Sequence, residues 1–436
     1  MYTNYFFEIL NPRPPSKIVN HVIGIRKYLR TKVGTKSIQP LMLKIAQLRA
    51  DTPACAHKIH LNNAGASLQP NPVLKAVYRH LELESQLGGY EAADAMAAEI
   101  AGFYTSVARL LHTQPRNIAF TASATDAYAK ALSSIPWRAD EVILTTENDY
   151  ASNQIAFLSL QKRLGVRLLR ARDLASGGVD VDDFERLMRQ HHPVLAAVTH
   201  VPTNSGLVQP VEAIGKICRE LGSWYLVDAC QSAGQMDLDV AQIGCDFLSA
   251  TMRKYLRGPR GAGFLFASDR VLDAGLELLL PDMRSADWSG ADEYNTAPTA
   301  RRFEYWETPI ALLLGSKAAV DYALEVGLDL AAARINQLAE LTRELLAALP
   351  GVRVLDEGAR LCGIVTAQGD HWETKALMEK LYAANINCRI SPRTAAQIDF
   401  GRKGVEWAIR VSPHYYNTEE EIREFVEVLQ DTPGHF

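Results

Sequence analysis

Short apolar segments alternate with helix-like segments from about residue 60 to residue 255, and this alternation restricts the fold more than any other feature. The strand-like segments are NIAFTAS, EVILTTE, GVRLLRA, PVLAAVTHV, SWYLVDAC and FLSAT. Segments such as ATDAYAKALSSI and EAIGKICRELG between them have helical apolar spacing. Strands that are apolar throughout are typical of parallel sheets covered by helices on both faces. The pattern predicts an α/β fold with a mostly parallel sheet flanked by helices.

The chain of 436 residues is long enough for a large domain and a smaller one. After residue 310, two long helix-like segments lead to the strand-like VRVLD, CGIVTAQ and WAIRVSP and to a final helix, TEEEIREFVEVLQ. We predict a large domain over residues 59–310 and a smaller α/β domain over residues 311–436. Residues 1–58 are predicted to be a basic arm or extension, because Glu8 is the only acidic residue before Asp51. An Arg-rich, acid-poor transit peptide is the alternative.

Composition excludes several classes of function. The net charge of -4 gives no general reason to expect nucleic acid binding. No apolar run approaches the ~18 residues of a membrane span, so no membrane partner is expected. The six cysteines have no CxxC spacing, which argues against a zinc site and against a disulfide-rich secreted fold. We expect no metal, reduced thiols and a cytoplasmic protein.

Unusual residues follow several of the predicted strands, at the edge where open parallel sheets bind ligands. Asp228 comes directly after an apolar strand, where a carboxylate is costly unless it is paired. Ser123, Ala124 and Thr125 stand at a strand-to-helix turn, whose free N–H groups can bind a phosphate. Lys254 follows FLSAT and precedes three glycines, which suggests backbone packed tightly against a ligand. Taken together, a lysine, an aspartate and a phosphate seat indicate pyridoxal 5'-phosphate.

Six motifs, in order, resemble those of the class V aminotransferase family of fold-type I pyridoxal phosphate enzymes. This family includes cysteine desulfurases, C–S lyases and isopenicillin N epimerase-like proteins. The similar segments are IHLNNAGASLQP, TASATDAY, VDACQSAGQ, TMRKYLRGPRG, RRFEYWETP and AIRVSPHYYNTEEEI, and the similarity spans about residues 59–430.

The resemblance implies roles for the residues at motif positions. Lys254 would carry the cofactor and move protons at the substrate carbon, and Asp228 would keep the pyridine nitrogen protonated. Tyr150 would stack on the cofactor ring and count as catalytic with Lys254. Arg410 would bind the substrate α-carboxylate, with Asn63 and Ala64 close to the substrate. The other implied cofactor contacts are Ala124, Thr125, Thr203, Gln231, Thr251, Arg253 and, from the partner in a homodimer with shared sites, Thr308.

One departure from the family bears on the reaction. Desulfurases need a nucleophilic thiol on a late loop to accept sulfur, and alignment of INCRISPRTAAQID places Thr394 near that slot. Cys388 falls in a strand-like segment and is expected to be buried. The leading hypothesis is therefore a C–S lyase that releases pyruvate and ammonia from a cysteine S-conjugate or sulfoxide, similar to the ergothioneine-type sulfoxide lyases. An aminotransferase, an amino-acid epimerase, a cysteine desulfurase and, remotely, a non-catalytic pyridoxal phosphate-binding regulator are the alternatives.

Overall fold

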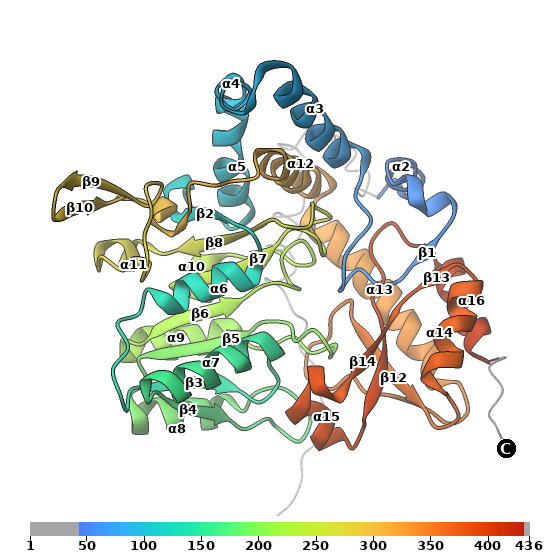
Figure 1. Cartoon of the computed structure of the whole chain (residues 1–436). Coiled ribbons are helices and arrows are strands. Elements are labelled where there is room, and N and C mark those ends of the chain that lie inside the picture. The colour runs from blue at the N-terminus through green and yellow to red at the C-terminus, as the bar shows by residue number, and fades with distance from the viewer. Residues whose placement is uncertain (1–42, 431–436) are drawn as a thin grey trace, which may run out of the picture. The chain divides into compact units, whose positions relative to one another are not determined.

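The computed structural model describes residues 43–430, and a seven-stranded sheet of order β2-β8-β7-β6-β5-β3-β4 lies at its centre (Figure 1). β8 is antiparallel to both neighbours, and the remaining neighbouring strands pair in parallel. This confirms the predicted mostly parallel sheet, although β8 was not predicted. The strands are β2 (Ile118–Thr121), β3 (Val142–Thr146), β4 (Arg167–Ala171), β5 (Leu195–Thr199), β6 (Trp224–Asp228), β7 (Phe247–Thr251) and β8 (Gly263–Ala267).

Helices cover both faces of this sheet and bury a core on each side. Consecutive residues of β3 enter opposite cores, Ile143 on one side and Leu144 on the other. This is the alternation of a strand buried on both faces. One face is covered by α6 (Ala124–Ser133) and α7 (Ala151–Leu164), and the other by α5 (Ala97–Leu110), α8 (Val181–His191), α9 (Val211–Leu221) and α12 (Ile310–Val326).

A second, antiparallel sheet of order β11-β12-β15-β14 carries the C-terminal part of the chain (Figure 1). Its strands are β11 (Val352–Val354), β12 (Val365–Gly369), β14 (Arg389–Pro392) and β15 (Trp407–Val411). The helices that share its core are α13 (Leu328–Ala347), α14 (Thr374–Ala383) and α16 (Glu419–Gln430). A small α/β region thus follows the large sheet, as the sequence predicts.

The segment before residue 59 packs against the C-terminal region wherever the structure describes it. Arg49 of α2 (Ile45–Ala50) donates to Glu421 at 2.8 Å and to the carbonyl oxygen of Tyr416 at 3.0 Å. β1 (Ile59–His60) pairs in parallel with β13 (Ile386–Asn387). Residues 43–60 therefore join the small region, and the remainder of the predicted arm, residues 1–42, lies outside the described residues.

The remaining elements connect these layers. They are α3 (Asn71–Leu87), α4 (Gly89–Ala95), α10 (Val240–Ile243), α11 (Asp269–Asp273), α15 (Gln397–Lys403) and the antiparallel hairpin of β9 (Ala286–Gly290) and β10 (Glu293–Thr296). Within residues 43–430, no helix is both long enough and apolar enough to cross a membrane. A cluster of buried side chains, including Tyr255 after β7 and Tyr416 before α16, joins the large sheet to the small region.

Candidate active site

The carboxyl ends of β5, β6 and β7 lie side by side and carry Thr199, Asp228 and, three residues beyond β7, Lys254. Asp228 is the last residue of β6 and pairs in register with Thr199 on one side and Ser249 on the other. The order of the strands therefore places the predicted lysine and aspartate at one edge of the sheet, where open parallel sheets bind ligands.

Lys254 is 4% exposed, and its Nζ lies 5.9 Å from the centre of the Tyr150 ring. Burial lowers the pKa of its amine, and the charges of Arg253 and Arg410 act in the same direction. Cys230 and Asp228 oppose this shift. A lowered pKa increases the fraction of neutral amine, which is the form that attacks a carbonyl carbon.

Asp228 is 3% exposed, and both of its carboxylate oxygens accept hydrogen bonds. Oδ1 accepts from the backbone N–H of Cys230 at 2.9 Å, and Oδ2 accepts from Nδ2 of Asn153 at 3.1 Å. Burial raises the pKa of Asp228, while these two donors and the charge of Lys254 lower it. Asn153, in the first turn of α7, was not predicted, because an asparagine at a helix start usually has a local role.

The predicted phosphate seat is the N-terminus of α6. Ser123 is the N-cap residue, and its hydroxyl accepts from the backbone N–H of Asp126 at 3.1 Å. A Cβ on Gly263 would lie 2.8 Å from the carbonyl carbon of Ser123 and 3.1 Å from the nitrogen of Ala124, so only glycine lets β8 approach this turn. Thr125 is the exposed second residue of the helix.

The glycines after Lys254 pack against protein. A Cβ on Gly258 would lie 2.7 Å from the Cβ of Met252, and Gly261 has a φ of +79°. The tight contact that excludes a side chain at Gly258 is made by the chain itself, and the expectation that these glycines border a ligand stays a prediction. At Gly263 the contact is with the phosphate seat.

The two remaining predicted donors in the lysine turn, Thr251 and Arg253, both donate to backbone carbonyl oxygens. The Thr251 hydroxyl donates to the carbonyl oxygen of Ala262 at 3.3 Å. The Arg253 guanidinium donates to the carbonyl oxygen of Gly65, in the loop after β1. Arg253 thus lies against the predicted substrate loop.

Arg410, on β15, is 6% exposed and reaches the same loop. Nη2 donates to Oδ1 of Asn62 at 3.1 Å and Nη1 to the carbonyl oxygen of Thr203 at 3.3 Å. Burial lowers the pKa of Arg410 to about 10, and the charges of Arg389 and Arg253 contribute. Arg389 is the register partner of Arg410 on β14, and like charges directly opposite are unfavourable. An anion bound beside Arg410 would relieve this repulsion.

The substrate loop contains two asparagines with different partners. Nδ2 of Asn63 donates to the carbonyl oxygens of His60 and Ser412, and Oδ1 accepts from the Tyr416 hydroxyl at 2.6 Å. The side chain of Asn63 is thus used to hold the loop, while its neighbour Asn62 contacts Arg410. Asn63 was predicted and Asn62 was missed, because the sequence does not show which of two adjacent asparagine side chains points toward Arg410.

Gln231 links Ala64 and Thr203. Its Nε2 donates to the carbonyl oxygen of Ala64 at 3.0 Å and to the Thr203 hydroxyl at 3.2 Å. Its Oε1 is buried and has no hydrogen-bond partner among the described residues, and the same is true of Nε of Arg410. Buried polar atoms are normally paired, so these two atoms indicate that the site is completed by a ligand.

Thr394 is exposed in the short 3₁₀ turn Arg393–Ala395 between β14 and α15. Cys388 is 2% exposed just before β14, and burial raises its pKa to about 12, so it is buried as predicted. Cys230 is the one cysteine that interacts with Lys254, whose charge and hydrogen bond oppose the rise that burial causes in the thiol pKa. The late loop thus carries no thiol.

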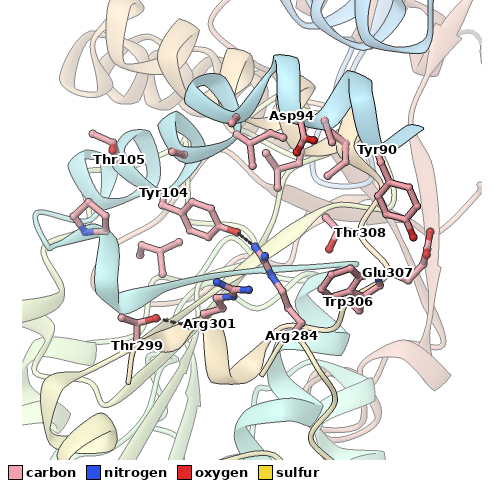
Figure 2. A pocket seen from close by; sticks show the side chains of 18 of the residues that line it. Tyr90, Asp94, Tyr104, Thr105, Arg284, Thr299, Arg301, Trp306, Glu307 and Thr308 are labelled. Carbon is pink, nitrogen blue, oxygen red and sulfur yellow. Dashed lines mark hydrogen bonds between the residues drawn. The ribbon is translucent and has the colours of Figure 1, made fainter. Parts of the chain in front are cut away.

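Thr308 lies apart from this edge of the sheet and borders a separate cavity of about 990 Å³ (Figure 2). Its hydroxyl donates to the carbonyl oxygen of Tyr305 at 3.2 Å. Figure 2 shows Tyr90 of α4 and Trp306 at the same cavity, and these side chains are 74% and 48% exposed.

The residues at the carboxyl edge of the sheet fit pyridoxal phosphate. Lys254 supplies the buried amine and Asp228 the buried carboxylate. The α6 N-terminus supplies free N–H groups. No group of three or more metal-ligating side chains was found within residues 43–430.

The chain resembles known proteins over most of its length. The aminotransferase class-V family model matches residues 59–425. A relative named "Probable cysteine desulfurase" from Methanothermobacter thermautotrophicus is 26% identical over 90% of this chain and 99% of its own length. A "Probable hercynylcysteine sulfoxide lyase" from Mycobacterium tuberculosis is 28% identical over 87% of this chain and 91% of its own.

Solved structures agree on the fold. The apo cysteine desulfurase from Thermococcus onnurineus NA1 superposes with a TM-score of 0.82 at 24% identity, covering 90% of this chain and 98% of that one. The cystine C-S lyase C-DES, in complex with cysteine persulfide, has a TM-score of 0.78 at 23% identity, covering 87% and 99%. The chain belongs to the aminotransferase class-V family of pyridoxal phosphate enzymes and has the type I fold of that family.

Proposed function

We propose that this chain cleaves the C–S bond of cysteine or of a cysteine derivative. The observation that carries the proposal is the grouping of an amine with a lowered pKa, a buried carboxylate and a guanidinium that has no carboxylate partner in the described part of the chain. These groups belong to Lys254, Asp228 and Arg410. The names of the relatives, several cysteine desulfurases and one sulfoxide lyase, support a sulfur-containing amino acid as the substrate.

Each of these residues has a task in such a reaction. When bound, pyridoxal phosphate withdraws electrons from the substrate α-carbon. Lys254 takes the α-proton as a neutral amine and returns it as an acid. Asp228 stabilises the proton on the pyridine nitrogen, and its burial strengthens that interaction. Arg410 fixes the α-carboxylate through its planar pair of N–H donors.

Two fates of the sulfur are open to this site. Desulfuration, which releases alanine, is the better supported by the names of the relatives. β-Elimination, which releases pyruvate and ammonia, is favoured by Thr394 in the loop where desulfurases carry the accepting thiol, and by the burial of Cys388. The second fate needs no protein thiol.

A product assay separates the two fates. Protein saturated with pyridoxal phosphate is incubated with cysteine, cystine, cysteine S-conjugates and their sulfoxides, while alanine, pyruvate, ammonia and sulfide are measured together. Alanine, with its sulfur recovered as sulfide after a thiol reductant such as dithiothreitol is added, establishes desulfuration, and Cys230→Ser then tests whether the thiol next to Lys254 takes part. Equal amounts of pyruvate and ammonia establish β-elimination. Turnover of none of these substrates, with transamination or epimerisation of a sulfur-free amino acid instead, overturns the proposal.

We also propose that two copies of the chain build the active sites together. Thr308 matches the family's motif for a contact with the partner's cofactor, and it lines the cavity in Figure 2, to which Lys254 does not contribute. The exposed aromatic side chains of Tyr90 and Trp306 at this cavity support burial by a second copy.

A further inference from the structure

Asp149 is a second carboxylate at this edge of the sheet, and its position was not recognised from the sequence. It lies in the turn between β3 and α7, directly before Tyr150. The hydrogen bonds it accepts come from the backbone N–H of Tyr150 (2.6 Å), Nε2 of Gln154 (2.6 Å), Nδ2 of Asn153 (3.2 Å), the Thr145 hydroxyl (3.4 Å) and, at short range, the Thr199 hydroxyl. Burial raises the pKa of Asp149, and these donors oppose that rise because each of them stabilises the charged carboxylate.

Asn153 connects this carboxylate to Asp228. Its Nδ2 lies 3.1 Å from Oδ2 of Asp228, 3.2 Å from Oδ1 of Asp149 and 3.2 Å from the hydroxyl oxygen of Thr199. The Thr199 hydroxyl donates its proton to Asp149, so its oxygen is free to accept from Asn153. The orientation of the Asn153 amide, and with it the hydrogen bond to Asp228, is therefore fixed by Asp149.

The same carboxylate also holds Tyr150. Tyr150 is the N-cap residue of α7, and its backbone N–H is bound to Oδ1 of Asp149. Its ring faces the Lys254 amine at 5.9 Å. One side chain thus determines the position of the ring predicted to stack on the cofactor and, through Asn153, of the carboxylate predicted to meet the pyridine nitrogen.

We propose that Asp149 is a positioning residue for the cofactor. It orients Asp228 through Asn153, places Tyr150 through the backbone, and adds a second negative charge near the pyridine nitrogen. The charged and titratable groups around that position are Asp149, Asp228, Tyr128, Lys254, Cys230, Arg253 and Arg410. Without Asp149 the net charge of the groups around the pyridine nitrogen becomes more positive, and this disfavours protonated forms of the bound cofactor. The inference rests on the proposed roles of Lys254 and Asp228 and is independent of the fate of the sulfur.

The test compares Asp149→Asn and Asn153→Ala with the parent protein. Two quantities are measured: the dissociation constant of pyridoxal phosphate, by absorbance titration, and the pH midpoint of the visible absorbance of the cofactor linked to Lys254. We expect both variants to bind the cofactor about tenfold more weakly, the effect that partners behind a directly bound residue commonly have. In Asp149→Asn the pH midpoint moves to lower pH, because the linked proton has lost a negative charge nearby.

Two controls make the result decisive. Asp173→Asn makes the same chemical change after the neighbouring strand β4, at a residue without a hydrogen bond to this network, and leaves both quantities within twofold of the parent. Thr199→Val replaces Asp149→Asn if the latter does not fold, with a shift in the same direction. An unchanged pH midpoint in Asp149→Asn, together with a clear shift in Asp228→Asn, overturns the inference. Asp149 would then only stabilise the turn in which it lies. If Asp228→Asn changes neither quantity, the proposed cofactor site itself fails.

Discussion

Arg410 is a guanidinium whose hydrogen bonds, at 3.3 Å to a carbonyl and 3.1 Å to an amide, leave it without an anionic partner among residues 43–430. A bidentate carboxylate contact would satisfy it better than these neutral acceptors. We predict that Arg410→Lys raises KM for the amino-acid substrate about 10- to 100-fold, since hydrogen bonds to charged groups contribute about 1.5–3 kcal/mol.

The cofactor dissociation constant should not change in this variant, because Arg410 contacts the substrate loop and not the α6 turn. Steady-state kinetics and absorbance titration measure the two effects separately. Arg389→Lys, on the neighbouring strand, is the matched control and is expected to raise KM less. A loss of cofactor binding in Arg410→Lys that equals the rise in KM would show that Arg410 does not discriminate between the two ligands.

The sequence identifies the residues at motif positions, but it does not identify the residues that hold those side chains in place. Lys254 and Asp228 follow apolar strands, so their placement at one sheet edge is predictable from topology alone. Asp149 and Asn153 sit at a helix start, where acidic and amide side chains normally cap the helix. Their partner Thr199 is 46 residues from Asn153 in the chain, and only the paired strands bring them together.

Among the elements, the buried parallel strands were predictable because each is an uninterrupted apolar run between two helices. β8 was missed because GFLFA begins with a glycine and follows two more, Gly258 and Gly261, a composition that favours a turn over a strand. The β9–β10 hairpin was missed because its side chains are mostly exposed and polar, so no alternation marks it. The strands of both elements pair antiparallel with their neighbours. Antiparallel strands need no crossover helix between them, so the alternation of strands and helices does not reveal them.

Asp173, which follows β4, faces α15 of the small region. A substitution at this residue therefore probes the contact between these two elements. Its Oδ1 is buried without a hydrogen-bond partner among the described residues. Burial, together with the charge of Glu147, raises the pKa of Asp173 to about 6. The folded state therefore binds more protons than the unfolded state between about pH 4 and pH 6, and the free energy of unfolding falls as the pH rises through that range.

We predict that Asp173→Asn increases the free energy of unfolding at pH 7.5 by about 1–2 kcal/mol, after allowance for solvent screening, and has little effect at pH 4. Denaturant unfolding of the cofactor-saturated protein at both values measures this. Asp370→Asn, at an exposed carboxylate, should be neutral at both. Equal stabilisation by Asp173→Asn at pH 4 and pH 7.5 would mean that the gain does not come from the buried charge.

For the whole molecule, the proposal that Thr308 completes the site of a second copy can be tested, because Thr308 lines a cavity to which Lys254 does not contribute. Thr308→Glu would set a carboxylate against the cofactor phosphate and weaken binding, while Lys254→Ala removes the amine. If the residues act across the interface, a mixed dimer of the two variants contains one site with both native residues and one with neither. Random mixing of the chains then restores about a quarter of the sites, because half of the dimers are mixed.

Activity and cofactor absorbance should therefore reappear when the two inactive variants are unfolded and refolded together, and sedimentation should give twice the mass of the chain. If Thr308 instead acted on its own chain's cofactor, each mixed dimer would carry one defect per site and no activity would return. Complementation thus reports which chain supplies Thr308, a distinction that neither variant makes alone.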